Sequence, residues 1–320
     1  MLAGYISGAG VELARVKTRG GAMALYNQAS FVSRNFSNLE SILNLYLKKN
    51  KDEITRACFG VAGPVINDEV RTTNLPWHIS QERIQDKFSL GQVRLINDIV
   101  ATAHGLAELP SSSFFTINNG HTSNSGNLGL IAAGSGLGEA LIYRDAQTFL
   151  PYASEGGHAD FAPGSQLECE LWEYLYAELG HVEVEDVVSL TGLERIFGFV
   201  VESHGMTPSA WFTKAKDKAG AIIERALSGT DDNAVRALDI FIDCYASEAA
   251  NLALKGMTLG GIYIGGLIAP QIITALDKGR FMERFIKKGK MESLLTSMPV
   301  GVIIEEKTAL MGAAAVALKM

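Results

Sequence analysis

The stretch LAGYISGAGVELARV, residues 2–16, places a glycine-bearing turn between two short apolar runs. Apolar runs on both sides of such a turn are typical of a β-hairpin. We expect strands at Leu2–Ile6 and Val11–Lys17, joined by a turn at Ser7–Gly10, and a third strand at Met23–Phe31. Backbone N–H groups in a glycine turn can approach an anion closely, but a single turn of this kind more often binds nothing.

Strands and helices then alternate along the chain. SNLESILNLYLKK, residues 37–49, has apolar residues at helical spacing, with Ser37 as the expected N-cap and Glu40 three residues later. The segment 54–63, ITRACFGVAG, predicts a buried strand, and 92–109, QVRLINDIVATAHGLAEL, predicts a strand followed by a helix. This order indicates an α/β protein with a mostly parallel sheet that is covered by helices.

Two domains are expected in a chain of 320 residues. Pro110–Ser113 and the loop 116–127, which is rich in Ser, Asn and Gly, mark the expected boundary. We predict a small α/β domain at 1–110, completed by the strand and helix of residues 300–320. The larger α+β domain would then be 111–299, because the middle segment resembles an insertion between two halves of the first domain.

Composition limits the classes of partner. Apolar residues make up 47% and charged residues 20%, which is ordinary for a globular protein with a real core. The formal net charge of -7 argues against nucleic acid as a partner, since binding it requires a basic face. We see neither a signal peptide nor an apolar run of about 20 residues. Three scattered cysteines, expected to be buried, are typical of a reducing compartment, and we predict a cytoplasmic protein with no membrane span.

Three glycine-rich turns follow predicted strands: GYISGAG, AAGSGLG and IGGLIAP. Gly134, Gly136 and Gly138 could belong to a dinucleotide fingerprint, but the next segment, LGEALIYR, predicts a strand instead of the helix that a pyrophosphate requires. This disfavours a dehydrogenase. No GKS or GKT follows, so a Walker loop is excluded. Three such turns in one chain favour phosphate binding more than any one of them does.

Polar residues gather at two further places. In RLINDIV, Asn97 and Asp98 follow a predicted strand, at the end where open α/β sheets place ligands. A carboxylate there could take a proton from a hydroxyl that attacks phosphorus, or either residue could simply cap the next helix. These two interpretations are about equally supported.

The segment SEGGHADFAPGS concentrates Glu155, His158 and Asp160 around two glycines. All three are metal-ligand types, but without a second histidine or a cysteine cluster nearby we favour the recognition of sugar hydroxyls. Glu185, in HVEVEDVVSL, could join this set or could be a solvated carboxylate at the start of a helix.

Six segments in this order resemble the bacterial-type glucokinases. They are CFGVAGPV, TTNLPW, LINDIVATAHGL, AAGSGLGEA, EGGHADFAP and GGIYIGGLIAP, and the match as a whole runs from about residue 30 to the end. The resemblance implies an actin-like ATPase (ribonuclease H-like) fold with a cleft between two domains. Zinc-bearing sugar kinases of the related ROK group would need a clustered cysteine motif, which is missing here.

The resemblance also implies a role for each matching residue. Asp98 would be the catalytic base for the 6-hydroxyl of glucose, or of a close hexose. The other sugar ligands would be Asn74, Asn97, Glu155, His158 and Glu185. ATP, carrying Mg²⁺, would be the phosphoryl donor, and no protein-bound metal is expected. The nucleotide would contact Gly4, Gly8, Gly134, Ser135, Gly136, Gly265 and Gly266. A homodimer would match the habit of the family.

The first hairpin departs from the family pattern. The family has approximately Asp-x-Gly-Gly-Thr, whereas this chain has Tyr5-Ile6-Ser7-Gly8-Ala9. Tyr5 removes a carboxylate near the metal and terminal phosphates, and Ala9 removes a hydroxyl that would contact phosphate. We therefore expect an ATP-dependent glucokinase with impaired phosphate handling. The alternative is a catalytically weak or inactive sugar-binding or regulatory protein of the same fold.

Overall fold

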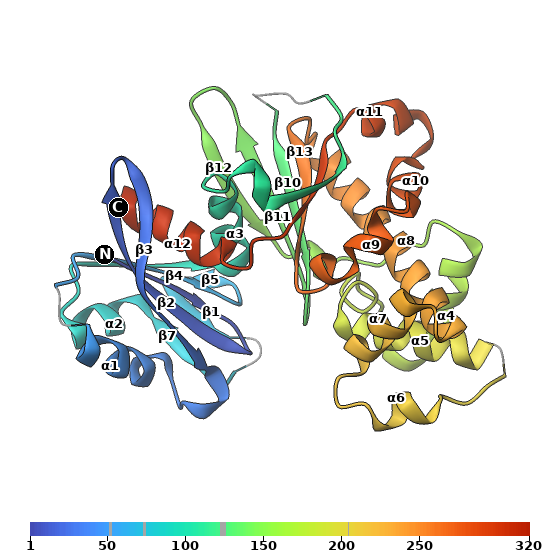
Figure 1. The fold of residues 1–320 in the computed structure, drawn as a ribbon, viewed down its shortest axis with the longest axis horizontal. Helices are drawn as coiled ribbons and strands as arrows, with labels where there is room; N and C mark the ends of the chain where they lie inside the picture. Colours follow the sequence, from blue (N-terminus) through green and yellow to red (C-terminus); the bar gives the residue numbers. More distant parts are fainter. Residues whose placement is uncertain (51–52, 73–74, 122–125, 204) are drawn as a thin grey trace. The chain divides into compact units, whose positions relative to one another are not determined.

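The computed structural model describes residues 1–50, 53–72, 75–121, 126–203 and 205–320 (Figure 1). The chain forms two compact units. Unit 1 consists of Met1–Ser112 and Glu305–Met320, and unit 2 consists of Ser113–Ile304. The chain therefore leaves unit 1 to build the whole of unit 2, and then returns to unit 1.

Unit 1 is built on a five-stranded sheet in the order β3-β2-β1-β4-β8. The first three strands form an antiparallel meander, and β4 and β8 run parallel to β1. The strands are β1 Leu2–Ile6, β2 Gly10–Arg19, β3 Ala22–Val32, β4 Arg56–Val61 and β8 Gln92–Asn97. A small second sheet contains β5 Val65–Ile66, β6 Glu69–Arg71 and β7 His78–Ser80. The expected hairpin and the parallel strands are confirmed.

Helices cover both faces of this sheet (Figure 1). They are α1 Leu39–Lys49, α2 Gln81–Phe88, α3 Asp98–Leu106 and α12 Thr308–Lys319, with a 3₁₀ turn, η1, at Ser33–Asn35. Along β1, Leu2 and Ile6 face a core that includes α1 and α2, whereas Ala3 faces a core that includes α3 and α12. This alternation, with a period of two residues, lets one short strand serve two cores.

Helices α3 and α12 pack closely because glycines lie at their contact. A Cβ atom at Gly312 would lie 1.7 Å from the carbonyl oxygen of Ala101, and one at Gly105 would lie 2.1 Å from the carbonyl oxygen of Thr308. Neither position can hold a side chain without moving the helices apart. The residues that follow unit 2 in sequence are thus fitted into the core of unit 1.

Unit 2 is built on a six-stranded sheet in the order β12-β11-β10-β13-β14-β9. Strands β10, β13 and β14 are parallel, and the other neighbouring pairs are antiparallel. The strands are β9 Phe114–Asn118, β10 Leu128–Ala133, β11 Leu137–Arg144, β12 Phe149–Ser154, β13 Gly261–Gly266 and β14 Val300–Ile303. The strand that we predicted directly after Gly136 is confirmed as β11.

The helices of unit 2 surround one long helix, α8, of 25 residues, which packs against β10 and β13. The helices are α4 Gln166–Leu179, α5 Leu190–Ser203, α6 Ala210–Lys214, α7 Lys218–Ser228, α8 Asp232–Gly256, α9 Ile273–Leu276, α10 Arg280–Ile286 and α11 Glu292–Thr296. Short 3₁₀ turns are η2 Ser111–Ser113, η3 Gly156–His158, η4 Ala269–Ile272 and η5 Gly289–Met291. Among the described residues, no helix has the length and apolar character needed to cross a bilayer.

Three expectations from the sequence differ from the structure. The strand of residues 300–303, assigned above to the first domain, pairs with β13 and β9 in the sheet of unit 2. Helix α1 is capped by Asn38, whose side chain accepts the N–H of Ser41, and not by Ser37. Cys169 is exposed on α4, whereas Cys58 and Cys244 are buried.

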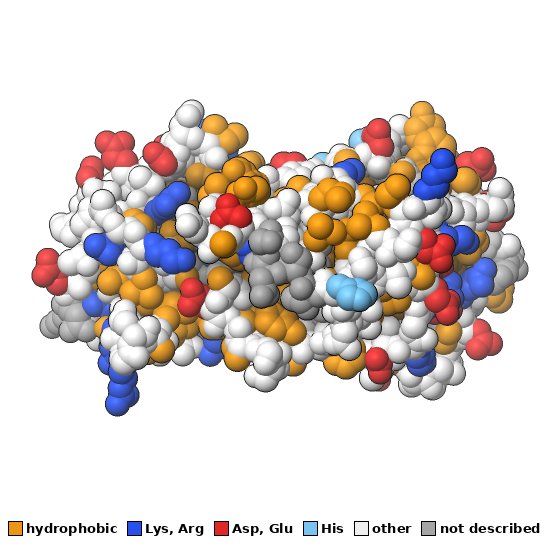
Figure 2. Space-filling view, turned by 90° about the horizontal axis from the view of Figure 1, so that it is seen from above, with side chains coloured by type: hydrophobic (Ala, Val, Ile, Leu, Met, Phe, Trp, Pro, Cys, Tyr) orange, Lys and Arg blue, Asp and Glu red, His pale blue; other side chains and the backbone are white. Residues whose placement is uncertain are grey.

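Charged side chains of both signs are interspersed over the face of the molecule shown in Figure 2. The described basic residues do not form a continuous band on that face.

Candidate active site

In unit 1, Asn97 and Asp98 lie where β8 ends and α3 begins. The Asn97 side chain caps the helix by accepting the N–H of Ile99 at 3.0 Å, and its Nδ2 donates to the carbonyl oxygen of Gly63 at 3.0 Å. Asp98 Oδ1 also accepts from the N–H of Ile99, at 2.9 Å. The capping role foreseen for this pair is therefore present. Because both side chains are only partly buried at this sheet end, capping leaves them accessible to a ligand.

Tyr5 lies in the electrostatic field of Asp98. It faces Gly60 across the β1–β4 pair, and Gly60 in turn lies against α3, where its Cβ atom would be 2.7 Å from that of Ala101. Burial raises the pKa of the Tyr5 phenol well above its usual value, and the charges of Asp98 and Glu12 raise this pKa further. The phenol therefore stays neutral and can only be a hydrogen-bond partner, not a carboxylate-like charge, in this part of unit 1.

The first hairpin turn is closed by its own residues. The N–H of Ser7 donates to the carbonyl oxygen of Gly10 at 2.9 Å, and the N–H of Gly10 donates to Ser7 Oγ at 3.2 Å. Within the described ranges, the N–H groups of Gly8 and Ala9 have no hydrogen-bond partner, which leaves two donors at the tip. Gly4, in contrast, is buried in β1, where a Cβ atom would lie 2.5 Å from the ring of Phe59.

In unit 2, the two other glycine turns lie side by side. Strands β10 and β13 are parallel neighbours, with Ala133 opposite Gly266. The turns that follow them therefore start at the same end of the sheet, where both strands finish. Gly266 has a φ of +85°, and a Cβ atom there would lie 2.2 Å from the carbonyl oxygen of Ala133. That oxygen accepts the N–H groups of Leu267 and Ile268 at 2.9 and 3.2 Å. Only glycine fits this junction.

A buried tyrosine from α8 holds the same two strands together. The hydroxyl group of Tyr245 accepts the N–H of Ala133 at 3.2 Å and lies 3.2 Å from the carbonyl oxygens of Ile131 and Gly265, its possible acceptors. The residue is 0% exposed, and burial raises the pKa of its phenol far above the ordinary value. The phenol therefore remains protonated and bridges β10 to β13 just below the glycine turns.

The structure also brings the sugar-ligand candidates of unit 2 next to the hairpin at residues 134–136. Glu185 Oε2 accepts the N–H of Leu137 at 2.8 Å, and the N–H of Glu185 donates to the carbonyl oxygen of Gly157 at 2.8 Å. A Cβ atom at Gly136 would lie 2.5 Å from Glu185 Oε2. Glu185 is thus partly buried and does not lie at a helix start, since α5 begins at Leu190.

Glu155 precedes the 3₁₀ turn η3, which follows β12, and His158 is the last residue of that turn. The N–H of His158 donates to the carbonyl oxygen of Glu155 at 3.0 Å, and both side chains are exposed. The hydrogen bond to Glu183 is the main cause that raises the pKa of the His158 imidazole, and the charges of Glu185 and Glu155 raise it further. Glu155, His158 and Glu185 therefore form one polar group, and Glu185 joins this group to the 134–136 hairpin.

Sequence reasoning missed two groups in this neighbourhood. The first is a set of neighbouring side chains in which His158 contacts Glu183 and His181 contacts Asp160. The alternation of HVEVE, in which residues 181, 183 and 185 share one side of an extended segment, is the signal that could have found it.

The second missed group is Glu139 on β11, which is only 2% exposed. Its Oε1 has no hydrogen-bond partner among the described residues, and a Cβ atom at Gly156 would lie 2.1 Å from its Oε2. Burial, followed by the charge of Glu248, raises the pKa of this carboxyl to about 7. It lies directly beneath the turn that carries His158.

Two points concern the predicted sugar ligand Asn74 and the disfavoured metal interpretation. Asn74 lies outside the described residues. In the part of the chain that the structure does describe, no three His, Cys, Asp or Glu side chains are close enough to hold a metal ion. The interpretation of Glu155, His158 and Asp160 as a metal site therefore has no geometric support.

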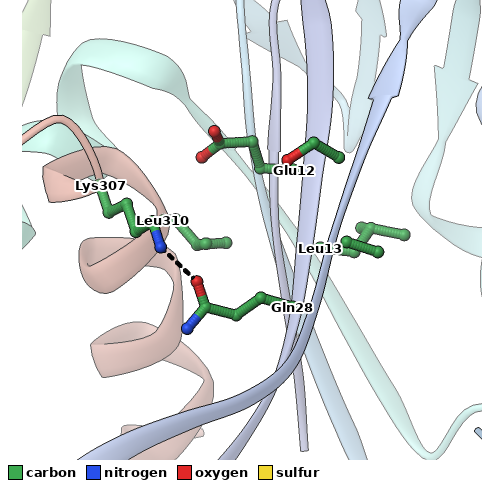
Figure 3. A pocket seen from close by; sticks show the side chains of 7 residues that line it. Glu12, Leu13, Gln28, Lys307 and Leu310 are labelled. Atoms are coloured by element: carbon green, nitrogen blue, oxygen red, sulfur yellow. Dashed lines mark hydrogen bonds between the residues drawn. The ribbon is translucent and has the colours of Figure 1, made fainter.

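A pocket of about 140 Å³ lies elsewhere in unit 1, between β2, β3 and α12 (Figure 3). Lys307 Nζ donates to Gln28 Oε1 at 2.6 Å at its edge. No predicted site residue lines it; its walls are formed by Glu12, Leu13, Gln28, Ala29, Ser30, Lys307 and Leu310. We therefore do not assign the sugar or the nucleotide to this pocket.

The two units, with their two sheets and the paired glycine turns, define an α/β protein of the actin-like sugar-kinase fold. The crystal structure of a glucokinase from an Antarctic psychrotroph matches 100% of this chain and 99% of its own, with a TM-score of 0.86 and 30% identity. A ROK family glucokinase from Streptomyces griseus, solved in complex with glucose and AMPPNP, shares the fold at a TM-score of 0.68 and 17% identity, covering 100% of this chain and 99% of its own.

The similarity in sequence indicates a narrower class of protein than the fold does. The Glucokinase family matches residues 2–320. A glucokinase of Synechocystis sp. (strain ATCC 27184 / PCC 6803 / Kazusa) is 40% identical over 282 residues, which are 83% of this chain and 79% of the relative. The chain belongs to the glucokinase family.

Proposed function

We propose that this protein transfers a phosphoryl group from ATP to the 6-hydroxyl of glucose. The observation that carries the proposal is in unit 2, where Glu185 accepts the N–H of Leu137 beside the 134–136 hairpin and its own N–H donates to Gly157, between Glu155 and His158. Membership of the glucokinase family and the glucose and AMPPNP bound by the S. griseus enzyme support the same substrates. A close hexose with matching hydroxyls is the natural competitor of glucose.

The reaction assigns a role to each group. Asp98 of unit 1 takes the proton of the 6-hydroxyl as this oxygen bonds to the γ-phosphorus and the bond to ADP breaks. Asn97 and the described unit 2 carboxylates and imidazole bind the other hydroxyls, and we propose Asn74 for the same task. The glycine turns at 134–136 and 265–266 hold the nucleotide, which brings Mg²⁺ with it as part of the substrate.

The first hairpin should make this transfer slow. The tip amides of Gly8 and Ala9 can still meet a phosphate oxygen, but Tyr5 brings a neutral phenol where the family has a carboxylate, and Ala9 has no hydroxyl. Phosphoryl transfer depends on positioning and on charge neutralisation, so we expect a loss of about a hundredfold or more in kcat compared with an intact hairpin.

A coupled assay for glucose 6-phosphate, with and without Mg·ATP, tests the proposal. We expect slow, nucleotide-dependent product formation that Asp98→Asn abolishes. The double change Tyr5→Asp, Ala9→Thr should raise kcat at least about tenfold, because it restores the missing carboxylate and hydroxyl. Absence of product from folded wild-type protein at saturating substrates would refute the enzymatic claim.

Tyr5 and Ala9 also favour a second candidate, a sugar-binding or regulatory protein without catalysis. Calorimetry distinguishes the two functions, because this candidate binds glucose but binds no nucleotide, even when glucose is present. In that case the double change Tyr5→Asp, Ala9→Thr tests whether the hairpin alone is responsible.

We further propose a cytoplasmic homodimer that has no nucleic-acid partner. Light scattering during size-exclusion chromatography measures the mass in solution, and a mass near that of one chain would contradict the dimer.

A further inference from the structure

Glu183 makes a short bond to an imidazole that the proposed function uses. Its Oε2 lies 2.6 Å from Nδ1 of His158, and its Oε1 lies 3.8 Å from Nδ1 of His181. His181 Nε2 in turn lies 2.8 Å from Asp160 Oδ1. The Glu183 side chain is 32% exposed, so the pair is shielded in part from water.

The backbone fixes where Glu183 lies. Residues 159–161 and 182–184 pair in antiparallel fashion, with a bridge between Asp160 and Glu183. The N–H of Val184 donates to the carbonyl oxygen of Ala159 at 2.9 Å, and the N–H of Phe161 donates to the carbonyl oxygen of Val182 at 2.9 Å. The carboxylate is therefore held beside the residue next to His158 by main-chain bonds, independently of any ligand.

This contact distinguishes the two nitrogens of His158. An ionised carboxylate can only accept, so the proton must lie on Nδ1. Nε2 has no partner within the described part of the chain, and the side chain is 51% exposed. Nε2 is therefore the ring atom that can meet a ligand.

We propose that Glu183 is a positioning residue of the sugar site that acts through His158: its carboxylate holds Nδ1–H and presents Nε2 to a sugar hydroxyl. The inference rests on the proposed function, in which His158 binds the sugar. Glu183 orients the imidazole ring and favours its protonated form, and it does not itself touch the substrate.

The charges around His158 decide how the ring titrates. Glu155 lies on the same turn, and Glu183 and Glu185 face it from the neighbouring segment; the bond from Glu183 is the largest cause of the raised pKa. His181, whose pKa is raised mainly by Asp160, also faces Glu183.

A raised pKa means that His158 keeps its positive charge to higher pH than an ordinary histidine does. The cationic ring donates from Nε2, and bonds from a charged donor are the stronger ones. Affinity for glucose should therefore fall as the pH rises through the pKa of His158. Without the charge of Glu183, the same fall should occur at lower pH.

Two substitutions separate orientation from charge. Glu183→Gln keeps an oxygen that can accept from Nδ1, and Glu183→Ala keeps nothing. Glu173→Gln, at an exposed position on α4, is the matched control. The measurements are the His158 titration by imidazole NMR, assigned with His158→Gln, and the dissociation constant of glucose by calorimetry from pH 6 to pH 9.

For Glu183→Gln we expect a lower His158 pKa, near-normal glucose affinity at pH 6, and affinity about three- to tenfold weaker than wild type at pH 8. Glu183→Ala should be weaker at both pH values, and Glu173→Gln should match wild type. An unchanged His158 titration in Glu183→Gln, or a changed titration with unchanged glucose affinity at every pH, overturns the inference alone. Failure of the wild-type protein to bind glucose overturns the proposed function and this inference together.

Discussion

Glu139 is an acidic side chain in a place that suits its protonated form. Because its folded pKa of about 7 lies above the ordinary value of 4.5, its contribution to stability is complete below about pH 4.5 and is lost as the pH rises toward 7. At one pKa unit per 1.36 kcal/mol, the loss is about 3 kcal/mol.

Glu139→Gln should therefore become more stable relative to wild type as the pH rises, since glutamine does not titrate. We expect the difference in unfolding free energy to shift by about 2–3 kcal/mol between pH 5 and pH 8. Urea denaturation at a series of pH values measures it, with Glu173→Gln as the exposed control. A difference that stays constant over this range would show that Glu139 is already ionised at pH 5.

Tyr245 is the second residue for which the structure predicts a specific effect of substitution. Tyr245→Phe leaves the N–H of Ala133 and the carbonyl oxygen of Gly265 without this buried partner, which should cost about 1–3 kcal/mol. Because these groups lie just below the two glycine turns, KM for ATP should rise more than KM for glucose.

Thermal unfolding and steady-state kinetics test this expectation for Tyr245. Tyr152→Phe, at a tyrosine that is 55% exposed, controls for the loss of a hydroxyl as such. A Tyr245→Phe protein with the Tm and both KM values of wild type would contradict the bridging role.

Between elements, the contact of α3 with α12 should tolerate no added volume. Gly312→Ala places a methyl group where only 1.7 Å separates it from the carbonyl oxygen of Ala101. The helices must move apart, and we expect a loss of about 2–3 kcal/mol in unit 1.

Gly198→Ala on α5 is the matched control, because its new methyl group would lie 3.4 Å from the hydroxyl oxygen of Tyr174, an ordinary contact. Alanine is the better helix former, so this change should be neutral or stabilising by up to about 1 kcal/mol. Chemical denaturation followed by circular dichroism compares the two variants, and equal effects would mean that the α3–α12 contact is looser than described.

Elements were predictable from sequence where the signal was local. The hairpin at residues 2–17 and the strand that ends at Asn97 have periodic apolar residues and clear turn residues. The cap of α1 was misplaced by one residue because Ser37 and Asn38 are both good caps. Glu40, expected to complete a capping box, is instead buried and bonds to Arg83 at 2.6 Å, a partner 43 positions away that no local pattern reports.

At the scale of the whole molecule, the sequence could not say which sheet the strand 300–303 joins. Its apolar residues fit either sheet, and only its pairing with β13 and β9 decides. The candidate site, too, could be predicted only in part. Family resemblance implied Glu155, His158 and Glu185 as sugar ligands, but the contact of Glu183 with His158 spans 25 residues and became visible only in three dimensions.

The route of the chain through unit 1 has a consequence for its synthesis on the ribosome. Helix α12 fills the core beside β1 and α3, yet it is translated after the whole of unit 2. Nascent proteins generally complete their domains in the order in which they emerge. Here the first strands stay without α12 on one apolar face while unit 2 is synthesised and can already fold. The opening hairpin is therefore the part of the nascent chain that most needs a chaperone.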